Sequence, residues 1–332
     1  MRRILIDKGV EARALSLYKN LTDKNANKLG WKSMPLDRLK EFHSHLWKEG
    51  FYDQGRYVFA IIIYYDTLLM LEREEMKQVY ELIFRQWDYV LNIKLKYKSE
   101  TKEFYKHVID CMRYKDIRSS LMRSYMKEQG IKTCVYCNAQ YAVTTEEFVE
   151  DGEKRTVGTY QFDHFMPESK YPFLCTSYYN LQPSCPTCNG SKEQREAKFY
   201  LYTRDKNDMD VFWFELTPDK AVSAYVSEDM EKLEVKLNSP NDELLKNHQA
   251  LFHIDYIYEQ HIDVAQRILV MLRAFSDSYM QSLTDSIAAL FPCGVDDPES
   301  FFFGYYMKKE HVHLQPLSLM AQSVVKTIRA HG

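Results

Sequence analysis

Two short cysteine motifs, Cys134-Val-Tyr-Cys137 and Cys185-Pro-Thr-Cys188, enclose the stretch of sequence that decides the fold. Each Cys-x-x-Cys turn places two thiolates side by side, and two such turns supply the four soft ligands of a tetrahedral Zn²⁺ site. Four unrelated thiols are the alternative, but two such turns rarely frame one short segment by accident. The sequence therefore predicts one structural zinc ion, which would staple the enclosed segment and be held by Cys134, Cys137, Cys185 and Cys188.

The enclosed segment alternates strand-like and polar pieces. Residues 156–162 are rich in β-branched and aromatic residues and lead into Asp163-His164. Residues 180–183 form a second extended piece, and the pattern from Cys188 to Tyr200 predicts a helix. An earlier hairpin is indicated by the turn signal Asp151-Gly152.

Within this frame the order of residues resembles the HNH endonuclease family. The match consists of Phe162-Asp-His-Phe-Met-Pro167, Tyr179-Asn-Leu181 and Cys185-Pro-Thr-Cys-Asn-Gly-Ser-Lys192. It covers roughly 60 residues of the chain, and many members enclose the unit in the same pair of zinc knuckles. The resemblance implies a ββα-metal unit, in which a strand, an Ω-loop, a second strand and a helix surround a catalytic divalent ion.

Four side chains would carry the chemistry that this resemblance implies. His164 would act as the general base, because imidazole titrates near neutral pH and can take a proton from water. Asp163 and Asn189 would offer two hard oxygens to Mg²⁺ or Mn²⁺, while Asn180 would brace the loop that aims the histidine. Many members carry His at the position of Asn189, and this departure disfavours Zn²⁺ or Ni²⁺ at the catalytic site.

Basic side chains near the motif are candidates for contacting substrate phosphates. Lys192, Arg195 and Lys198 recur every three residues on the predicted helix, and Lys170 lies in the loop before the second extended piece. A solvated helix face, with the basic residues paired to neighbouring glutamates, is the alternative. We expect the substrate-binding residues to be Lys192, Lys170 and Arg195.

Charge is distributed unevenly along the chain. Residues 1–133 hold 26 Lys and Arg against 18 Asp and Glu, which gives +8. Residues 134–200 hold 6 against 9, giving −3, and residues 201–332 hold 12 against 20, giving −8. This asymmetry predicts three regions: a basic helical region that faces a polyanion, the metal-framed unit, and an acidic region better suited to a protein partner.

The flanking regions read as mostly helical. Apolar residues recur at helical spacing after Pro35, and residues 57–71 are apolar on nearly all sides, which predicts a buried helix. Short strands are expected within residues 211–237, including residues 221–226, and one long helix over residues 257–290. The predicted fold class is therefore α+β, mostly helical, with a central ββα-metal unit between helical regions.

The sequence favours a cytoplasmic protein without a membrane span. The apolar residues after Met1 are too few for a secretory signal, and Asp66 ends the most apolar run well short of a bilayer span. Seven cysteines, an odd number, with four in Cys-x-x-Cys pairs, indicate metal binding rather than a disulfide framework.

These features lead us to expect a metal-dependent HNH endonuclease, a hydrolase of phosphodiester bonds, with DNA favoured over RNA as the substrate. The helical flanks look like those of the HNH effector nucleases of prokaryotic antiphage systems of the Septu and retron-associated kind, which implies an ATPase partner. Two alternatives stay open: a stand-alone restriction-type or toxin nuclease, and a zinc-stabilised nucleic-acid-binding adaptor without catalysis.

Overall fold

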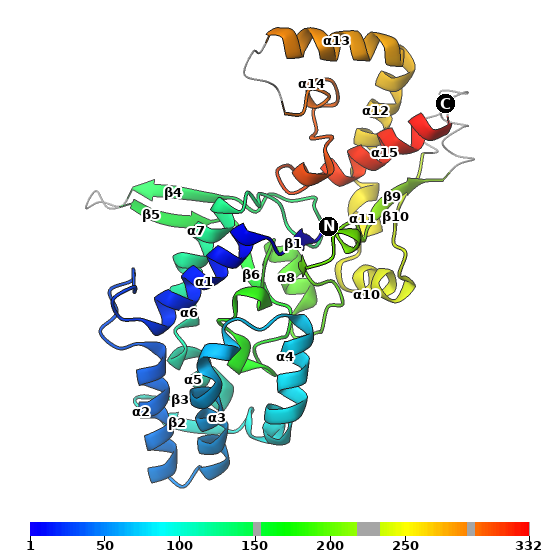
Figure 1. Ribbon diagram of the computed structural model, residues 1–332. Helices are drawn as coiled ribbons and strands as arrows, with labels where there is room; N and C mark the ends of the chain where they lie inside the picture. The colour runs from blue at the N-terminus through cyan, green and yellow to red at the C-terminus, as the bar shows by residue number, and fades with distance from the viewer. Residues whose placement is uncertain (149–153, 218–232, 291–295, 332) are drawn as a thin grey trace.

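The computed structural model describes residues 1–148, 154–217, 233–290 and 296–331. Within these ranges the fold is mixed and mostly helical, as predicted. Figure 1 shows an elongated molecule, with the amino-terminal helices at one end and the carboxy-terminal helices at the other. Among the described residues, every helix is too short or too polar to cross a membrane.

The amino-terminal part is built from helices and one hairpin. Its elements are α1 (Lys8–Thr22), α2 (Pro35–Lys48), α3 (Tyr52–Leu68), α4 (Arg73–Val79), a π-helical turn (Tyr80–Phe84), a 3₁₀ turn (Arg85–Val90), β2 (Lys94–Tyr97), β3 (Glu100–Glu103), α5 (Phe104–Cys111), α6 (Tyr114–Ser119) and α7 (Leu121–Glu128). Helix α2 begins at Pro35, whose fixed φ suits a first helical turn, and buries Leu39, Phe42 and Leu46 as their spacing predicts.

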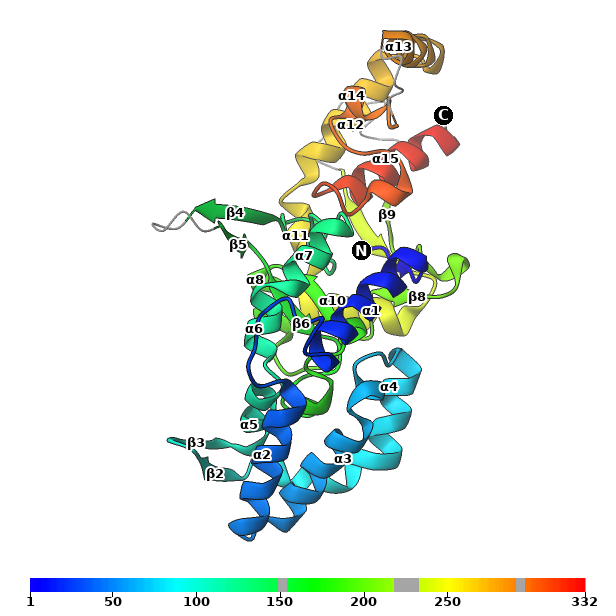
Figure 2. The ribbon, with the colours of Figure 1, turned by 60° about the vertical axis from the view of Figure 1, so that its left-hand side comes forward.

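The middle of the chain contains two antiparallel strand pairs and a short helix. β4 (Thr144–Phe148) pairs with β5 (Lys154–Gly158), and β6 (Gln161–His164) pairs with β7 (Leu181–Ser184). The loop between β6 and β7 carries two 3₁₀ turns, Pro172–Leu174 and Tyr178–Asn180, and α8 (Pro186–Lys192) follows β7 almost at once. Hairpins β2–β3 and β4–β5 project from the same side of the molecule (Figure 2). The predicted turn at Asp151-Gly152 lies outside the described residues.

The carboxy-terminal part packs helices around one strand pair. Its elements are β8 (Tyr202–Thr203), a 3₁₀ turn (Lys206–Asp208), β9 (Trp213–Leu216), β10 (Val235–Asn238), α10 (Asp242–Phe252), α11 (Ile254–Glu259), α12 (Ile262–Ala274), α13 (Asp277–Leu290), α14 (Ser300–Phe303), a 3₁₀ turn (Lys309–His311) and α15 (Ser318–His331). β9 pairs antiparallel with β10, and α15 packs on β9 and α12. The strand predicted over residues 221–226 lies outside the described residues.

Contacts between residues far apart in sequence tie the chain together. β1 (Ile4–Leu5) pairs in parallel with β8. Asn138, which directly follows the first cysteine motif, is fully buried at a φ of 51° and contacts the segment that leads into α15 and the first turn of that helix. Its side chain donates to the Val312 carbonyl at 2.8 Å, and the Leu317 and Leu319 backbone amides donate to its two oxygens at 2.6 and 3.2 Å.

Two of the predicted helices are shorter than expected. The helix predicted to run to Tyr200 ends at Lys192, because Glu193 takes a positive φ of 51°, and Arg195 and Lys198 therefore follow α8 rather than lie on it. The helix predicted over residues 257–290 is divided into α11, α12 and α13. The last break is marked by Ser276, whose hydroxyl accepts from the Tyr279 backbone amide as a helix cap does.

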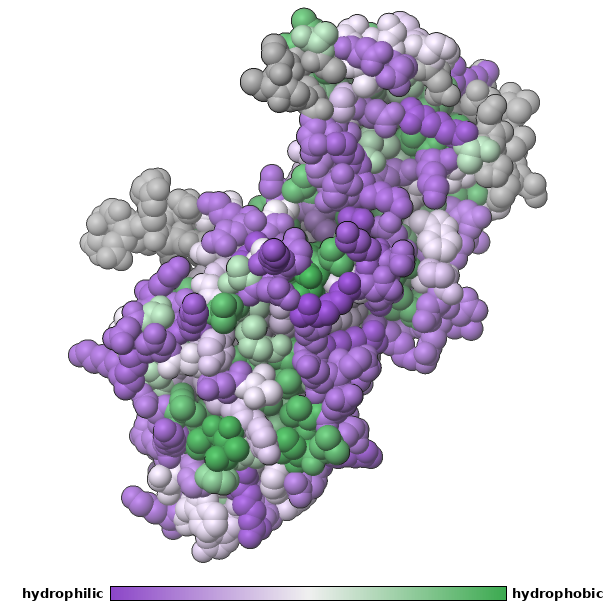
Figure 3. Space-filling view, viewed as in Figure 1, coloured by the Kyte–Doolittle hydropathy of each residue, from purple (hydrophilic) through white to green (hydrophobic). Residues whose placement is uncertain are grey.

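Helix α3 is not buried on all sides as its apolar sequence predicted. Phe59 and Ile63 are 50% and 59% exposed, and Trp47 of α2 is 44% exposed. The prediction was wrong because helices pack on only part of the α3 surface. Figure 3 shows hydrophobic residues gathered on the surface of the amino-terminal helices.

Candidate active site and metal centre

The four cysteines that the sequence assigns to zinc meet in the structure. Their sulfur atoms lie within 4.8 Å of one another, and all four residues are buried. In a tetrahedral site with Zn–S bonds of about 2.3 Å, the sulfurs are about 3.8 Å apart. The cluster is therefore compatible with a structural zinc ion, and Cys175, which is buried against Met112, is not part of it.

Hydrogen bonds among the crowded thiols shift their pKa values in opposite directions, and those with the other three cysteines raise the pKa of Cys188. Burial raises the pKa of Cys134, whereas hydrogen bonds with Cys134 hold the pKa values of Cys137 and Cys185 below the usual range. The backbone amides of Cys188 and Ala139 donate to the Cys185 and Cys137 sulfurs, each at 3.4 Å. Such N–H···S bonds stabilise thiolates, which are the form that binds zinc.

Helices α10 and α11 form hydrogen bonds with the backbone of the first cysteine motif. His248 donates from Nε2 to the Tyr136 carbonyl at 2.7 Å, and the Tyr258 hydroxyl donates to the Cys137 carbonyl at 2.8 Å. Complete burial lowers the pKa of His248 to about 3, so its ring is neutral at pH 7. The carboxy-terminal part therefore supports the cluster directly.

Tyr136, between the two cysteines of this motif, connects the cluster to the predicted catalytic carboxylate. Its hydroxyl donates to Asp163 Oδ2 and accepts from Gln182 Nε2 at 2.7 Å. The ring is fully buried and stacks on Phe252, with 4.4 Å between ring centroids. The cysteine cluster and Asp163 are thus joined by one buried side chain.

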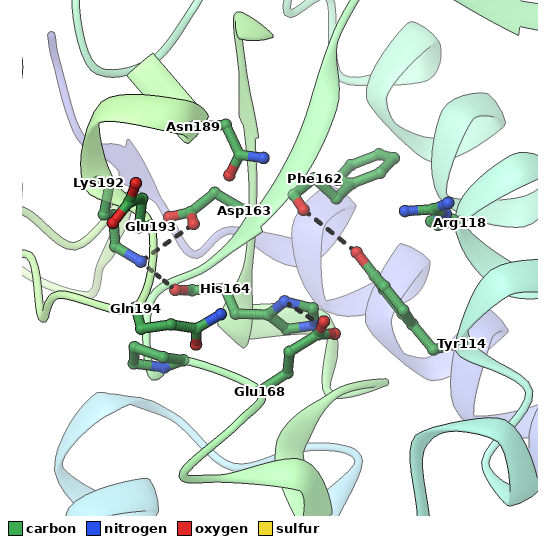
Figure 4. Close-up of a pocket in the computed structure, with 11 residues that line it drawn as sticks. Tyr114, Arg118, Phe162, Asp163, His164, Glu168, Asn189, Lys192, Glu193 and Gln194 are labelled. Carbon is green, nitrogen blue, oxygen red and sulfur yellow. Dashed lines mark hydrogen bonds and ion pairs between the residues drawn. The ribbon is translucent and has the colours of Figure 1, made fainter. Parts of the chain in front are cut away.

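A pocket of about 180 Å³ lies at the end of β6 and brings together three of the predicted catalytic residues (Figure 4). Asp163 and His164 come from β6, and Asn189 comes from α8. α6 forms another wall, and the loop after β6 contributes Glu168. The pocket is lined by Tyr114, Arg118, Phe162, Asp163, His164, Pro167, Glu168, Asn189, Lys192, Glu193 and Gln194.

His164 is oriented by the loop that follows it. Nε2 lies 3.1 Å from the Cys175 carbonyl, which can only accept, so this nitrogen carries the proton and Nδ1 keeps its lone pair. Burial lowers the pKa of His164 to about 4, so the ring is neutral at pH 7 and is a weaker base than a free imidazole. Glu168 Oε2 lies 3.6 Å from Nδ1, where a carboxylate would stabilise the protonated ring.

Asp163 is buried and forms an ion pair with Lys192. Lys192 Nζ donates to Asp163 Oδ1 at 3.0 Å and to the His164 carbonyl at 2.8 Å, and the Lys192 side chain has no exposed surface. Burial raises the pKa of Asp163, and the Lys192 charge opposes that rise. Lys192 was expected to face substrate phosphates, but here its charge is turned inward, because a buried carboxylate needs a counter-ion.

The two predicted asparagines occupy different environments. Asn189 is partly exposed and donates from its amide nitrogen to Gln161, which leaves its amide oxygen available on the pocket side, near Asp163 (Figure 4). Asn180 is fully buried outside the pocket and holds the loop: its oxygen accepts from the Met166 amide at 2.8 Å, and its nitrogen donates to the Met166 and Leu174 carbonyls. These contacts fit the predicted bracing role.

The other two predicted substrate contacts lie outside the pocket. Lys170 pairs with Glu196 at 3.3 Å and lies over the Tyr80 and Tyr171 rings, while Arg195 donates to the Ser191 carbonyl.

Sequence reasoning missed four residues that the structure places in or beside the pocket. These residues are Tyr114, Arg118, Tyr136 and Glu168. Tyr136 lies in the first cysteine motif and Glu168 directly follows the Phe162–Pro167 match, so both could have been considered. Tyr114 and Arg118 lie on α6, whose sequence gives no local signal of a site.

Comparison with known proteins gives one local similarity. A stretch of 71 residues is 32% identical to the Septu protein PtuB of Bacillus thuringiensis. It makes up 21% of this chain and 23% of the PtuB chain, so the match spans less than a quarter of either protein. No family model matches the chain, and no solved structure matches it.

Proposed function

We propose that this protein is a metal-dependent endonuclease of the HNH kind. The carrying observation is the orientation of His164: the Cys175 carbonyl holds Nε2, Glu168 lies 3.6 Å from Nδ1, and the pocket that the ring lines also contains Asp163 and Asn189. The order of β6, loop, β7 and α8 supports the same proposal, because it is the strand, loop, strand and helix order that the motif implies.

In the proposed reaction, His164 Nδ1 takes a proton from a water molecule as its oxygen attacks a phosphodiester. A new P–O bond forms, the bond to the leaving ribose or deoxyribose oxygen breaks, and that oxygen takes a proton from solvent. Glu168 stabilises the protonated imidazole, and the Asn180 contacts keep the loop, and with it the Cys175 carbonyl, in place.

Asp163 and Asn189 are the residues that would hold Mg²⁺ or Mn²⁺, which when bound supplies charge stabilisation to the phosphate and the leaving oxygen. The donor set fits a hard cation, because an amide oxygen is available and a carboxylate offers about four lone-pair directions. Tyr136 and Lys192 use two of those directions. Cys134, Cys137, Cys185 and Cys188 would hold the structural Zn²⁺.

The biological role we propose is antiphage defence, with the chain as effector nuclease beside an ATPase partner. Support comes from the local similarity to a Septu protein and from the acidic region, 201–332, which suits a protein partner better than a nucleic acid. A stand-alone nuclease is distinguished by co-purification: the proposal expects an ATPase to accompany the chain expressed from its native locus, and cleavage to respond to it.

The deciding experiment is a cleavage time course on duplex DNA, single-stranded DNA and RNA, with Mg²⁺, Mn²⁺ or chelator, and with the ATPase once it is found. Wild type should cut DNA only with the divalent ion. His164→Ala should lose about 10²–10⁴-fold in rate, because it removes the base and not the scaffold. Asp163→Ala and Asn189→Ala should fail through lost Mn²⁺ binding, and Asn180→Ala through a misplaced loop with Mn²⁺ binding nearly kept.

His43→Ala is the matched control, because His43 is a partly buried histidine on α2 that does not line the pocket. A His164→Ala protein that cuts as well as the His43→Ala protein would refute the assignment of the base. A wild type that binds nucleic acid but never cuts, with any metal or partner, would favour the adaptor alternative. One observation favours the adaptor alternative: both carboxylate oxygens of Asp163 already bind protein groups.

A further inference from the structure

Helix α6 belongs to the amino-terminal region but forms one wall of the pocket. Tyr114 fixes it there: its hydroxyl donates to the Phe162 carbonyl at 3.1 Å, and its ring centroid lies 4.7 Å from that of His164. Tyr114 and Ile117 are buried. The helix is therefore held against β6 at the residue immediately before Asp163.

The start of α6 is also anchored on its other side. Arg113 turns the chain out of α5 with a left-handed φ of 59° and pairs with Asp116 at 2.7 Å. Its guanidinium lies over the Trp31 ring, 4.6 Å from the ring centroid, and donates to the Ser33 carbonyl. Residues projecting from α6 into the pocket are thus presented from a fixed support.

Arg118 lies one helical turn after Tyr114 and is exposed at the pocket wall. Its guanidinium carbon is 5.6 Å from the centroid of the Tyr114 ring, and within the described part of the chain its N–H groups form no hydrogen bond. Among the described residues, no carboxylate lies within ion-pair distance of it. Figure 4 shows Arg118 and Lys192 at opposite sides of the pocket, with His164 and Glu168 between them.

The charges of the pocket lining distinguish Arg118 from the other charged side chains there. Lys192 is neutralised by Asp163, and the other charged groups of the lining are the acids Glu168 and Glu193. Burial is the main cause of the raised pKa of Glu168, and the Arg118 charge opposes that rise, so the charge of Arg118 acts on the pocket. An arginine with an open planar edge is suited to two parallel hydrogen bonds with a phosphate.

We infer that Arg118 is a phosphate-binding residue that holds a backbone phosphate of the nucleic-acid strand beside His164. This inference rests on the proposed nuclease function and adds to it a substrate contact from outside the zinc-framed segment. The contact is made to the backbone, so it carries no sequence preference. It also gives the basic amino-terminal region one defined place at which it meets the substrate.

The test uses the full chain and measures binding apart from cleavage. Arg118→Gln and Arg118→Lys are made in the His164→Ala background, and binding of a DNA oligonucleotide is measured at several salt concentrations. Arg118→Gln should weaken binding equally for unrelated sequences and reduce the salt slope by about 1. Arg118→Lys should restore the slope but only part of the affinity, because it keeps the charge and loses the planar fork.

Lys115→Gln is the matched control, because Lys115 is an exposed base on the same helix that lines a different cavity. In the His164-intact protein, Arg118→Gln should raise the KM for DNA at least several-fold, and Lys115→Gln should not. The inference is overturned if wild type cuts DNA and the Arg118→Gln and Lys115→Gln variants have the same KM. It is also overturned if Arg118→Gln weakens DNA binding only together with a loss of zinc content and a lower melting temperature. If wild type neither binds nor cuts, the nuclease proposal fails and this inference fails with it.

Discussion

The cysteine cluster and the pocket beside it are built in opposite ways. The cluster uses four identical side chains from two short turns, all buried and all directed at one point. The pocket uses unlike side chains from β6, α8, the loop after β6 and α6, and part of it faces solvent. The Cys-x-x-Cys spacing sets each pair of cluster ligands, whereas the mixed set of the pocket depends wholly on packing between distant elements, and Tyr136 joins the two sites.

The largest expected effect comes from breaking the cluster. Cys134→Ser or Cys188→Ser should abolish zinc binding and unfold the middle of the chain, because structural zinc contributes an apparent ~10–16 kcal/mol in small zinc domains. Elemental analysis and thermal melting measure the two effects. Cys175→Ala is the control: it removes a buried thiol outside the cluster and should leave zinc content at one per chain. A folded wild type without zinc would contradict the prediction.

Breaking the buried ion pair should have the next largest effect. Lys192→Met leaves the Asp163 carboxylate buried without its counter-ion, which should cost about 3–5 kcal/mol in the free energy of unfolding. The double variant Lys192→Met/Asp163→Asn should recover most of that loss, because no buried charge is left unpaired. Urea unfolding of the three proteins measures this. Equal stability of the single variant and wild type would show that Lys192 does not serve as the counter-ion.

Removing the hydrogen bond between Tyr136 and Asp163 should alter the pocket and leave the cysteine cluster unchanged. Tyr136→Phe keeps the ring on Phe252 but loses the hydrogen bond to Asp163, at a cost of about 1.5–3 kcal/mol, the range for bonds to charged groups. Zinc content should stay at wild-type level, while Mn²⁺ affinity, measured by titration calorimetry, should fall. Loss of zinc together with Mn²⁺ binding would mean that Tyr136 supports the cluster itself.

The smallest expected effect concerns pH and His248. Its pKa is about 3 when folded, against about 6.5 when unfolded, so below pH 6.5 protons bind the unfolded chain first and stability falls as the pH falls. Between pH 7 and 5.5 this amounts to about 1 kcal/mol. His248→Gln can keep the bond to the Tyr136 carbonyl without titrating, so its unfolding free energy should fall less over that range. Identical pH slopes would contradict this.

Local sequence signals account for the elements that were predicted well. The cysteine spacing predicted the cluster, and the Pro35 stripe predicted α2. Ser276-Asp277 was a capping signal inside the supposed long helix, and the apolar periodicity concealed it. The inward turn of Lys192 could not be predicted, since it depends on the burial of Asp163. The position of Arg118 at the pocket could not be predicted either, because it depends on the packing of α6 on β6.

The position of Asn138 has a consequence for the order of folding. Its long-range partners lie within residues 312–319, so these hydrogen bonds at the first cysteine motif form only after that segment has been made. At ~5–20 residues per second, synthesis takes about 10–35 s to cover that separation. Contacts so far apart in sequence also form slowly after synthesis, because loop closure costs entropy first. A segment in the first half of the chain is therefore among the last to reach its final environment.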